Sequence, residues 1–179
     1  MPYLIAAVVF VGLLCTLDLI LTLGVIKRLR EHTELISNLN GRASLGIGEE
    51  VGAFEAATVD GAPMTRELLT RETLVGFFSP SCAPCREELP KFVNHARAMP
   101  DGRNQVMAVV VGDADRAAAM VAELRPVARV VVEEHNDGPL ASAFQVIAFP
   151  TVLTVADGGD GTPVITQDRV KLGPAVVAA

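Results

Sequence analysis

FFSPSCAPCREELP, residues 77–90, contains two cysteines separated by two residues. It begins at the end of an apolar run, residues 74–78, that fits a buried strand. The residues after the second cysteine have helical spacing, so we expect a strand that leads directly into a helix beginning at the cysteines. At such a position the unpaired N–H groups and the helix dipole stabilise a thiolate.

The spacing predicts different roles for the two cysteines. Cys82 lies at the expected start of the helix, where it is exposed and suited to attack a disulfide. Cys85 lies one turn later, within disulfide reach, as the more buried resolving thiol. Pro84 suits the first helical turn because its missing N–H has no partner to lose there, and with Ala83 it would tune the reduction potential. We expect a redox-active Cys82–Cys85 disulfide, with no other cofactor and no metal.

A second feature is the sequence Phe149-Pro150-Thr151, which lies far along the chain and directly before an expected strand. An X-Pro bond can be cis, a state that is rare elsewhere and usually retained for a reason. Alone this proline is a weak signal, but together with the paired cysteines it is a strong one. We expect Pro150 to be cis.

Short apolar runs alternate with helical patterns through the rest of the chain, which predicts an α/β fold with a mixed sheet flanked by helices. Continuous apolar runs such as residues 106–111 are typical of central parallel strands. The strands are expected at 54–59, 74–78, 106–111, 129–133, 151–156 and 164–167, and the helices at 84–99, 113–124 and 140–144.

The N-terminal residues 3–26 are almost continuously apolar, and Asp18 is their only charge. As a helix this segment would be about 36 Å long, enough to cross a bilayer core. It lacks the basic start, the shorter apolar run and the cleavage site of a secretory signal, so we interpret it as an uncleaved anchor in which Cys15 is a small apolar filler. We therefore divide the chain into a transmembrane anchor (1–26), a juxtamembrane helix and linker (27–47) and a main domain (48–179).

Charge and composition exclude some functions and leave the orientation in the membrane ambiguous. The net charge of −6 and the absence of Trp argue against binding of a nucleic-acid backbone or of stacked bases. Lys27, Arg28 and Arg30 follow the apolar segment, and no Lys or Arg precedes it. By the positive-inside rule these residues favour a cytoplasmic main domain.

The stretch 77–90 resembles the active-site segment of thioredoxin-fold proteins, and more narrowly that of the TlpA-like and ResA-like membrane-anchored thiol-disulfide oxidoreductases. The narrower likeness lies in the sequence REELP that follows Cys85. Residues 51–54 and 59–61 are similar to the N-terminal extension of that subgroup, and residues 148–151 to its cis-proline loop. The resemblance covers roughly residues 48–170, and the anchor is also similar to that of the accessory thiol protein of methylamine utilisation.

This resemblance implies that Cys82 forms a mixed disulfide with a protein substrate and that Cys85 resolves it. It implies that Pro150 lies against the disulfide, while Phe149 and Ser81 contact the substrate and the backbone of Phe149 pairs with an extended substrate segment. The implied partners are a protein thiol or disulfide and a membrane electron donor, with the chain acting as a reductase. The resemblance also places the domain on the extracytoplasmic side of the cell membrane, against the indication of the basic flank.

The sequence departs from the family pattern at several positions. Ser81 stands where many relatives have Trp, and Gly76 where thioredoxins carry a buried acid that assists the second cysteine. Phe149 is large for the position before the cis-proline. The family also has a closing C-terminal helix, and we expect it to be truncated here, because residues 171–179 form only a short stub containing Gly173-Pro174.

Two other functions fit parts of the pattern. Ser79, three residues before Cys82, suggests a peroxiredoxin-like thiol peroxidase. A copper-delivery or assembly module would use Cys82 and Cys85 as ligands, with His135 as a third. A zinc site is disfavoured because the sequence has no second CxxC and its histidines are scattered: His32, His95 and His135.

Overall fold

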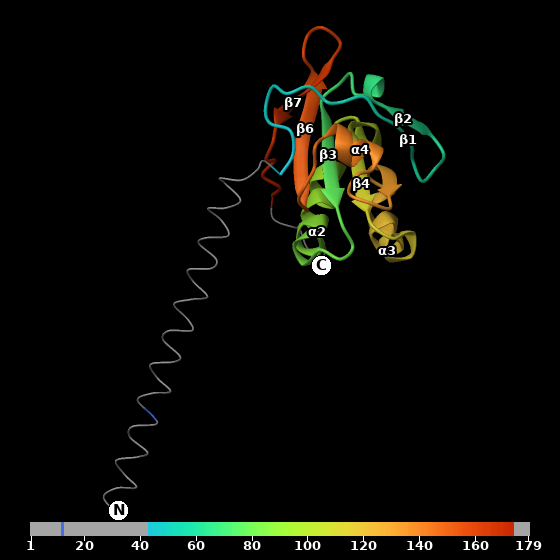
Figure 1. Ribbon diagram of the computed structural model, residues 1–179, viewed down its shortest axis with the longest axis vertical. Helices are drawn as coiled ribbons and strands as arrows, with labels where there is room; N and C mark the ends of the chain where they lie inside the picture. The colour runs from blue at the N-terminus through green and yellow to red at the C-terminus, as the bar shows by residue number, and fades with distance from the viewer. Residues whose placement is uncertain (1–11, 13–42, 174–179) are drawn as a thin grey trace, which may run out of the picture. The chain divides into compact units, whose positions relative to one another are not determined.

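Strands and helices alternate along the part of the chain that the computed structural model describes, Gly12 and residues 43–173 (Figure 1). The elements, in chain order, are β1 (Glu55–Ala57), β2 (Pro63–Thr65), η1 (Arg66–Leu68), β3 (Thr73–Phe78), α2 (Ala83–Arg97), η2 (Gly102–Gln105), β4 (Val106–Val111), α3 (Ala114–Leu124), β5 (Arg129–Glu133), α4 (Pro139–Ala143), β6 (Thr151–Asp157) and β7 (Pro163–Gln167).

The main sheet has five strands in the order β5-β4-β3-β6-β7. Strands β3, β4 and β5 run parallel, whereas β6 and β7 are antiparallel to their neighbours. Every residue of β3 and β4 is buried, as their continuous apolar sequences require of strands covered on both faces. The expected mixed sheet flanked by helices is therefore confirmed.

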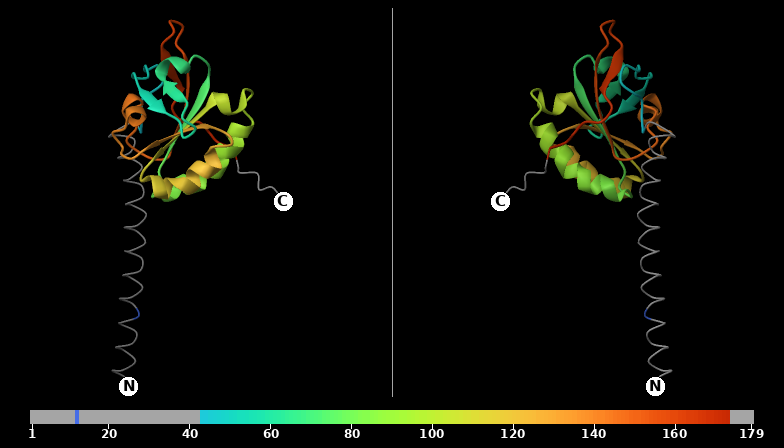
Figure 2. Two further views of the ribbon diagram at one scale, coloured as in Figure 1. Left: turned by 90° about the vertical axis from the view of Figure 1, so that its right-hand side faces the viewer. Right: turned by 90° about the vertical axis from the view of Figure 1, so that its left-hand side faces the viewer.

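Alternation along the central strands divides the interior into two layers. Leu74 and Phe78 of β3 pack with α2 and α3 on one face of the sheet. Val75 and Phe77 pack on the other face with α4 and with the segment that includes the β1–β2 hairpin. Figure 2 shows α2 and α3 on one side of the sheet, and α4, β1 and β2 on the other. The side-chain period of two in a strand explains this division.

The hairpin of β1 and β2 differs most from the sequence prediction. We expected one strand over residues 54–59, whereas β1 is shorter and pairs with the unpredicted strand β2. Asp60-Gly61 forms the connecting turn, as its sequence suggests, and Gly61 adopts a positive φ of 78° that favours glycine. A three-residue strand that begins with proline carries too little pattern to be recognised from sequence.

The segment that follows β7 bends at residues 168–169 and has no regular secondary structure over 170–173, so the structure assigns no helix to residues 168–173. Val170 N–H donates to the carbonyl of Val152 at 3.3 Å. Val170 and Leu172 pack against the same apolar cluster as α2 and α3. Part of this face of the sheet is thus covered by a segment without regular secondary structure.

The predicted anchor of residues 1–26, with Asp18 and Cys15, lies outside the described residues apart from Gly12, and so does most of the predicted linker. Among the residues that are described, no helix has both the length and the apolar character needed to cross a membrane. The division into anchor, linker and main domain stays a prediction.

Candidate functional site

The register of the sheet brings the paired cysteines and the distant proline together. β3 and β6 are antiparallel, and Phe77 pairs with Thr151. The end of β3 therefore lies beside the start of β6. The chain that leaves β3 carries Cys82, and the loop that enters β6 carries Phe149 and Pro150. Both segments therefore meet at the C-terminal end of β3.

Cys82 occupies the N-cap of α2 and is partly exposed. Its Sγ accepts a hydrogen bond from Cys85 N–H at 3.2 Å and thereby satisfies one of the unpaired donors of the first turn. The same thiol donates to the carbonyl oxygen of Phe149 at 3.4 Å. The sulfur of Cys82 is thus directed at the loop before Pro150, and the residue remains partly exposed.

Cys85 lies on the buried face of α2, where its side chain has no exposed surface. Burial in the apolar cluster raises the pKa of Cys85 to about 12, and the neighbouring thiol of Cys82 acts in the same direction. The backbone N–H of Ser79, at 3.5 Å from Cys85 Sγ, opposes this rise in pKa. Cys85 is therefore a protonated thiol at neutral pH, in contact with Cys82 but shielded from other reactants.

The Phe149–Pro150 peptide bond is cis. Thr151 Oγ1 donates to the carbonyl of Ala148 at 2.8 Å, which holds this loop against β6. Phe149 is partly buried and packs against both apolar clusters, whereas Ile147, two residues earlier, leaves 69% of its surface exposed. Among the described residues no group accepts a hydrogen bond from Phe149 N–H.

Gly76 has a steric explanation in the structure. A Cβ at this position would lie 2.6 Å from Cε2 of Phe92 and 2.7 Å from Cε2 of Phe78. Those two rings make an edge-to-face contact with centroids 5.1 Å apart. Aromatic carbon fills the space that a buried acid would need, so no carboxylate assists Cys85 from β3.

The other predicted substrate contacts lie around Cys82. Ser81, Ala83 and Pro84 are exposed, so no bulky side chain covers the sulfur from these positions. The hydroxyl of Ser79 pairs with that of Ser81 at 3.1 Å. The hydrogen bonds of Cys82 Sγ go to Phe149 and Cys85, so the hydroxyl of Ser79 is not placed as the partner of Cys82 that a peroxidase site would use.

The alternative metal ligands are not gathered at the cysteines. His95 is partly buried on α2, and His135 is exposed beyond β5. Within residues 43–173 no group of three or more His, Cys, Asp or Glu side chains is arranged to hold a metal ion. A third ligand from His135 is therefore not part of this site.

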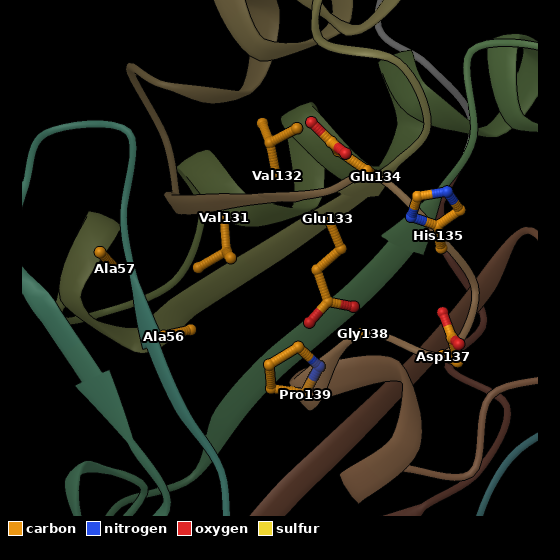
Figure 3. A pocket seen from close by; sticks show the side chains of 10 residues that line it. All are labelled: Ala56, Ala57, Val131, Val132, Glu133, Glu134, His135, Asp137, Gly138 and Pro139. Atoms are coloured by element: carbon orange, nitrogen blue, oxygen red, sulfur yellow. The ribbon is translucent and has the colours of Figure 1, made fainter.

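Glu133 is a buried acid that the sequence analysis did not single out. Figure 3 shows its side chain pointing from the end of β5 toward Gly138 and Pro139, in a pocket that His135 and Asp137 also line. Its carboxylate accepts hydrogen bonds from Leu140 N–H at 2.6 Å and from Ala141 N–H at 3.1 Å.

Burial raises the pKa of Glu133, although these two hydrogen bonds oppose the rise. Glu133 acts as the cap of α4, and the cysteines do not line its pocket. A charged residue that ends an apolar strand gives no local signal of such a distant contact.

Comparisons with known proteins identify the fold. No family model matches the chain, and no curated protein matches it. Among solved structures, the thioredoxin domain of a thiol-disulfide oxidoreductase from Bacteroides vulgatus has a TM-score of 0.55 at 18% identity, covering 72% of this chain and 91% of that one. A thiol:disulfide interchange protein from Bacteroides sp. gives 0.54 at 18% identity, covering 72% of this chain and 84% of that one.

The MTB protein dsbF, described in mixed oxidized and reduced forms, gives a TM-score of 0.50 at 24% identity and covers 66% of this chain and 87% of that one. At these identities the likeness concerns the fold. The described domain has the thioredoxin-like fold.

Proposed function

We propose that this protein is a membrane-anchored thiol-disulfide oxidoreductase that exchanges a Cys82–Cys85 disulfide with the thiols of protein substrates. The observation that carries the proposal is the asymmetry of the two sulfurs at the start of α2. Cys82 Sγ is partly exposed and contacts the loop of Pro150, and Cys85 is fully buried one turn later. This arrangement suits an attacking and a resolving thiol.

The loop that carries Phe149 supports a protein rather than a small-molecule substrate. The N–H of Phe149 can pair with an extended segment of a substrate chain, as in strand addition. The exposed side chain of Ile147 lies two residues away on the same loop and offers apolar contact.

We assign the reducing direction to this exchange. Strong oxidants of this chemistry owe their potential to a stabilised reduced form. Burial raises the pKa of Cys85, so the buried sulfur adds nothing to such stabilisation, and the resemblance to anchored reducing oxidoreductases favours the reducing direction. A donor of electrons to the disulfide is then required, and the predicted anchor of residues 3–26 would bring the domain to a donor in the membrane.

The reduction potential of the Cys82–Cys85 pair tests the direction of the reaction. Known dithiols range from about −270 mV for reductants to about −120 mV for strong oxidants. We expect a value near the reducing end when the full chain is equilibrated with glutathione or dithiothreitol buffers. A value near the oxidising end would reverse the direction, and a pair that forms no disulfide at any poise would rule out exchange and favour metal binding.

Reporter fusions at the C-terminus test the orientation. We propose an extracytoplasmic domain, because a large domain can be translocated despite basic residues such as Lys27 beside its anchor. Activity of a reporter that works only outside the cytoplasm is the expected result. Activity only of a cytoplasmic reporter would contradict the orientation and the implied class of exported substrates.

A further inference from the structure

Ser79 makes a backbone hydrogen bond to each residue of the cysteine pair. Its N–H donates to Cys85 Sγ at 3.5 Å. Its carbonyl accepts from Cys82 N–H at 3.1 Å. The turn that contains Ser79 therefore sets the position of both residues.

The side chain of Ser79 ties this turn together. Ser79 is only 9% exposed, and a buried hydroxyl without a partner is costly. Its Oγ pairs with Oγ of the exposed Ser81 at 3.1 Å. Alanine at position 79 would fill much the same space without needing a hydrogen-bond partner. The serine hydroxyl, in contrast, ties this part of the turn to Ser81.

No other group beside Cys85 replaces the hydrogen bond that Ser79 N–H donates to its sulfur. The space beside Gly76 is filled by the rings of Phe78 and Phe92, and the wider cluster around Cys85 is apolar. Cys82 is the one titratable group, among the described residues, that acts on Cys85. Outside α2 and Cys82, Ser79 N–H is the donor that approaches the resolving sulfur.

We propose that the hydroxyl pair of Ser79 and Ser81 positions the resolving cysteine by holding Ser79 N–H on Cys85 Sγ, where negative charge develops during the resolving step. This inference rests on the proposed exchange function. Ser79 and Ser81 are positioning residues, since they act through the backbone and do not react.

The resolving step balances as follows in atoms and electrons. Cys85 gives its thiol proton to water, and its sulfur bonds to Cys82 Sγ. The bond between Cys82 and the substrate sulfur breaks, and the substrate leaves with the electron pair as a thiolate. Cys85 is oxidised and the substrate sulfur is reduced.

A single turnover with the aromatic disulfide 5,5′-dithiobis(2-nitrobenzoate) separates the two steps. Attack by Cys82 releases a first thionitrobenzoate, and attack by Cys85 on the mixed disulfide releases a second. The full chain is used in detergent with Cys15→Ser, so that two thiols remain. Stopped-flow absorbance across a pH series is recorded for Ser79→Ala, Ser81→Ala, the double variant and the matched control Ser142→Ala, an exposed serine on α4.

We expect each single variant to slow the second release about three- to tenfold, the range that one hydrogen bond is worth, and to move its pH midpoint upward. Both releases of the control should be unchanged, and so should the first release of Ser79→Ala. The double variant should be no slower than the singles, because the two hydroxyls act as one unit. Ser81→Thr, which keeps a hydroxyl, should restore the wild-type rate.

Two results would overturn the inference while leaving the exchange function intact. One is an unchanged second release in Ser79→Ala. The other is an equal slowing of both releases, which indicates general distortion of the turn. Failure of the unmodified chain to give a second release would instead refute the exchange function itself.

Discussion

Helices α2 and α4 both begin shortly after the end of a parallel strand, and both carry a proline in the first turn, Pro84 and Pro139. The N–H groups of their first turns are hydrogen-bonded by different kinds of acceptor. In α2 the acceptor is the partly exposed thiol of Cys82, at 3.2 Å from Cys85 N–H. In α4 the acceptor is the buried carboxylate of Glu133. Glu133 ends the preceding strand, β5, and accepts from two N–H groups of α4.

The difference separates a reactive helix start from a structural one. A thiol is a weak acceptor, so α2 loses little when Cys82 Sγ turns to a substrate or bonds to Cys85. A carboxylate that accepts two hydrogen bonds in a buried site is a strong cap, and its removal leaves two donors unpaired. The need to cap a helix is common to both, and the chemistry of the cap decides whether the position can also react.

The structural cap also supports the reactive one. α4 runs directly into Phe144, and the next residues form the loop that ends at Pro150 beside Cys82. Phe144 contacts the rings of Phe54 and Phe77 in the core. By fixing the start of α4, Glu133 helps to define where this loop lies.

Replacement of the reactive cap should have the largest effect. Cys82→Ser should reduce disulfide exchange with a protein substrate to the uncatalysed rate, because no nucleophile remains at the exposed position. A serine hydroxyl can still cap α2, so thermal unfolding should change little. The matched variant Cys85→Ser should retain the first attack and hold one mixed disulfide per chain by mass spectrometry. Turnover by Cys82→Ser would show that the thiol that caps α2 is not the reacting group, and the contrast with the carboxylate cap of α4 would then carry no functional meaning.

Removal of the structural cap should lower stability far more than it slows exchange, because Glu133 acts on the loop beside Cys82 only through α4. Glu133→Ala should lower the free energy of unfolding by about 2 kcal/mol, since buried donors of α4 lose their acceptor. Its exposed neighbour serves as the control, and Glu134→Ala should stay within about 0.5 kcal/mol of the unmodified chain. Denaturant titration measures both. Equal midpoints for the two variants would mean that Glu133 does not cap α4 in solution.

The buried carboxylate should also make stability depend on pH. Burial raises the pKa of Glu133 in the folded state, so the unfolded state releases this proton first as pH rises. The contribution is fully present below the ordinary pKa of glutamate and is lost as pH rises through the raised value. Relative to Glu133→Gln, the unmodified chain should therefore lose stability over this window, by less than Glu133→Ala costs. Parallel unfolding curves across the window would contradict this assignment.

The two prolines should give the smallest effects and the sharpest contrast. Pro84→Ala and Pro139→Ala should each lower the free energy of unfolding by about 0.4–1 kcal/mol, because the unfolded chain becomes more flexible. Only Pro84→Ala should shift the reduction potential, since Pro84 lies between the two cysteines. A shift of the potential in Pro139→Ala would show that the start of α4 acts on the redox pair.

Local sequence was sufficient for the elements that lie within one strand or one helical turn. The runs 106–111 and 129–133 coincide with β4 and β5, because consecutive apolar side chains require burial on both faces. The placement of Cys82 and Cys85 at the start of a helix also followed from local spacing. In each case the residues that determine the structure are close neighbours in the chain.

The tertiary structure decided what depends on distant segments. The register of β3 against β6 brings the carbonyl of Phe149 to Cys82, and two phenylalanine rings occupy the space beside Gly76. Glu133 meets the first turn of α4 in the same way, through the path of the intervening loop. Residue spacing reports only on contacts within a few residues, whereas strand register and close packing are properties of the whole folded chain.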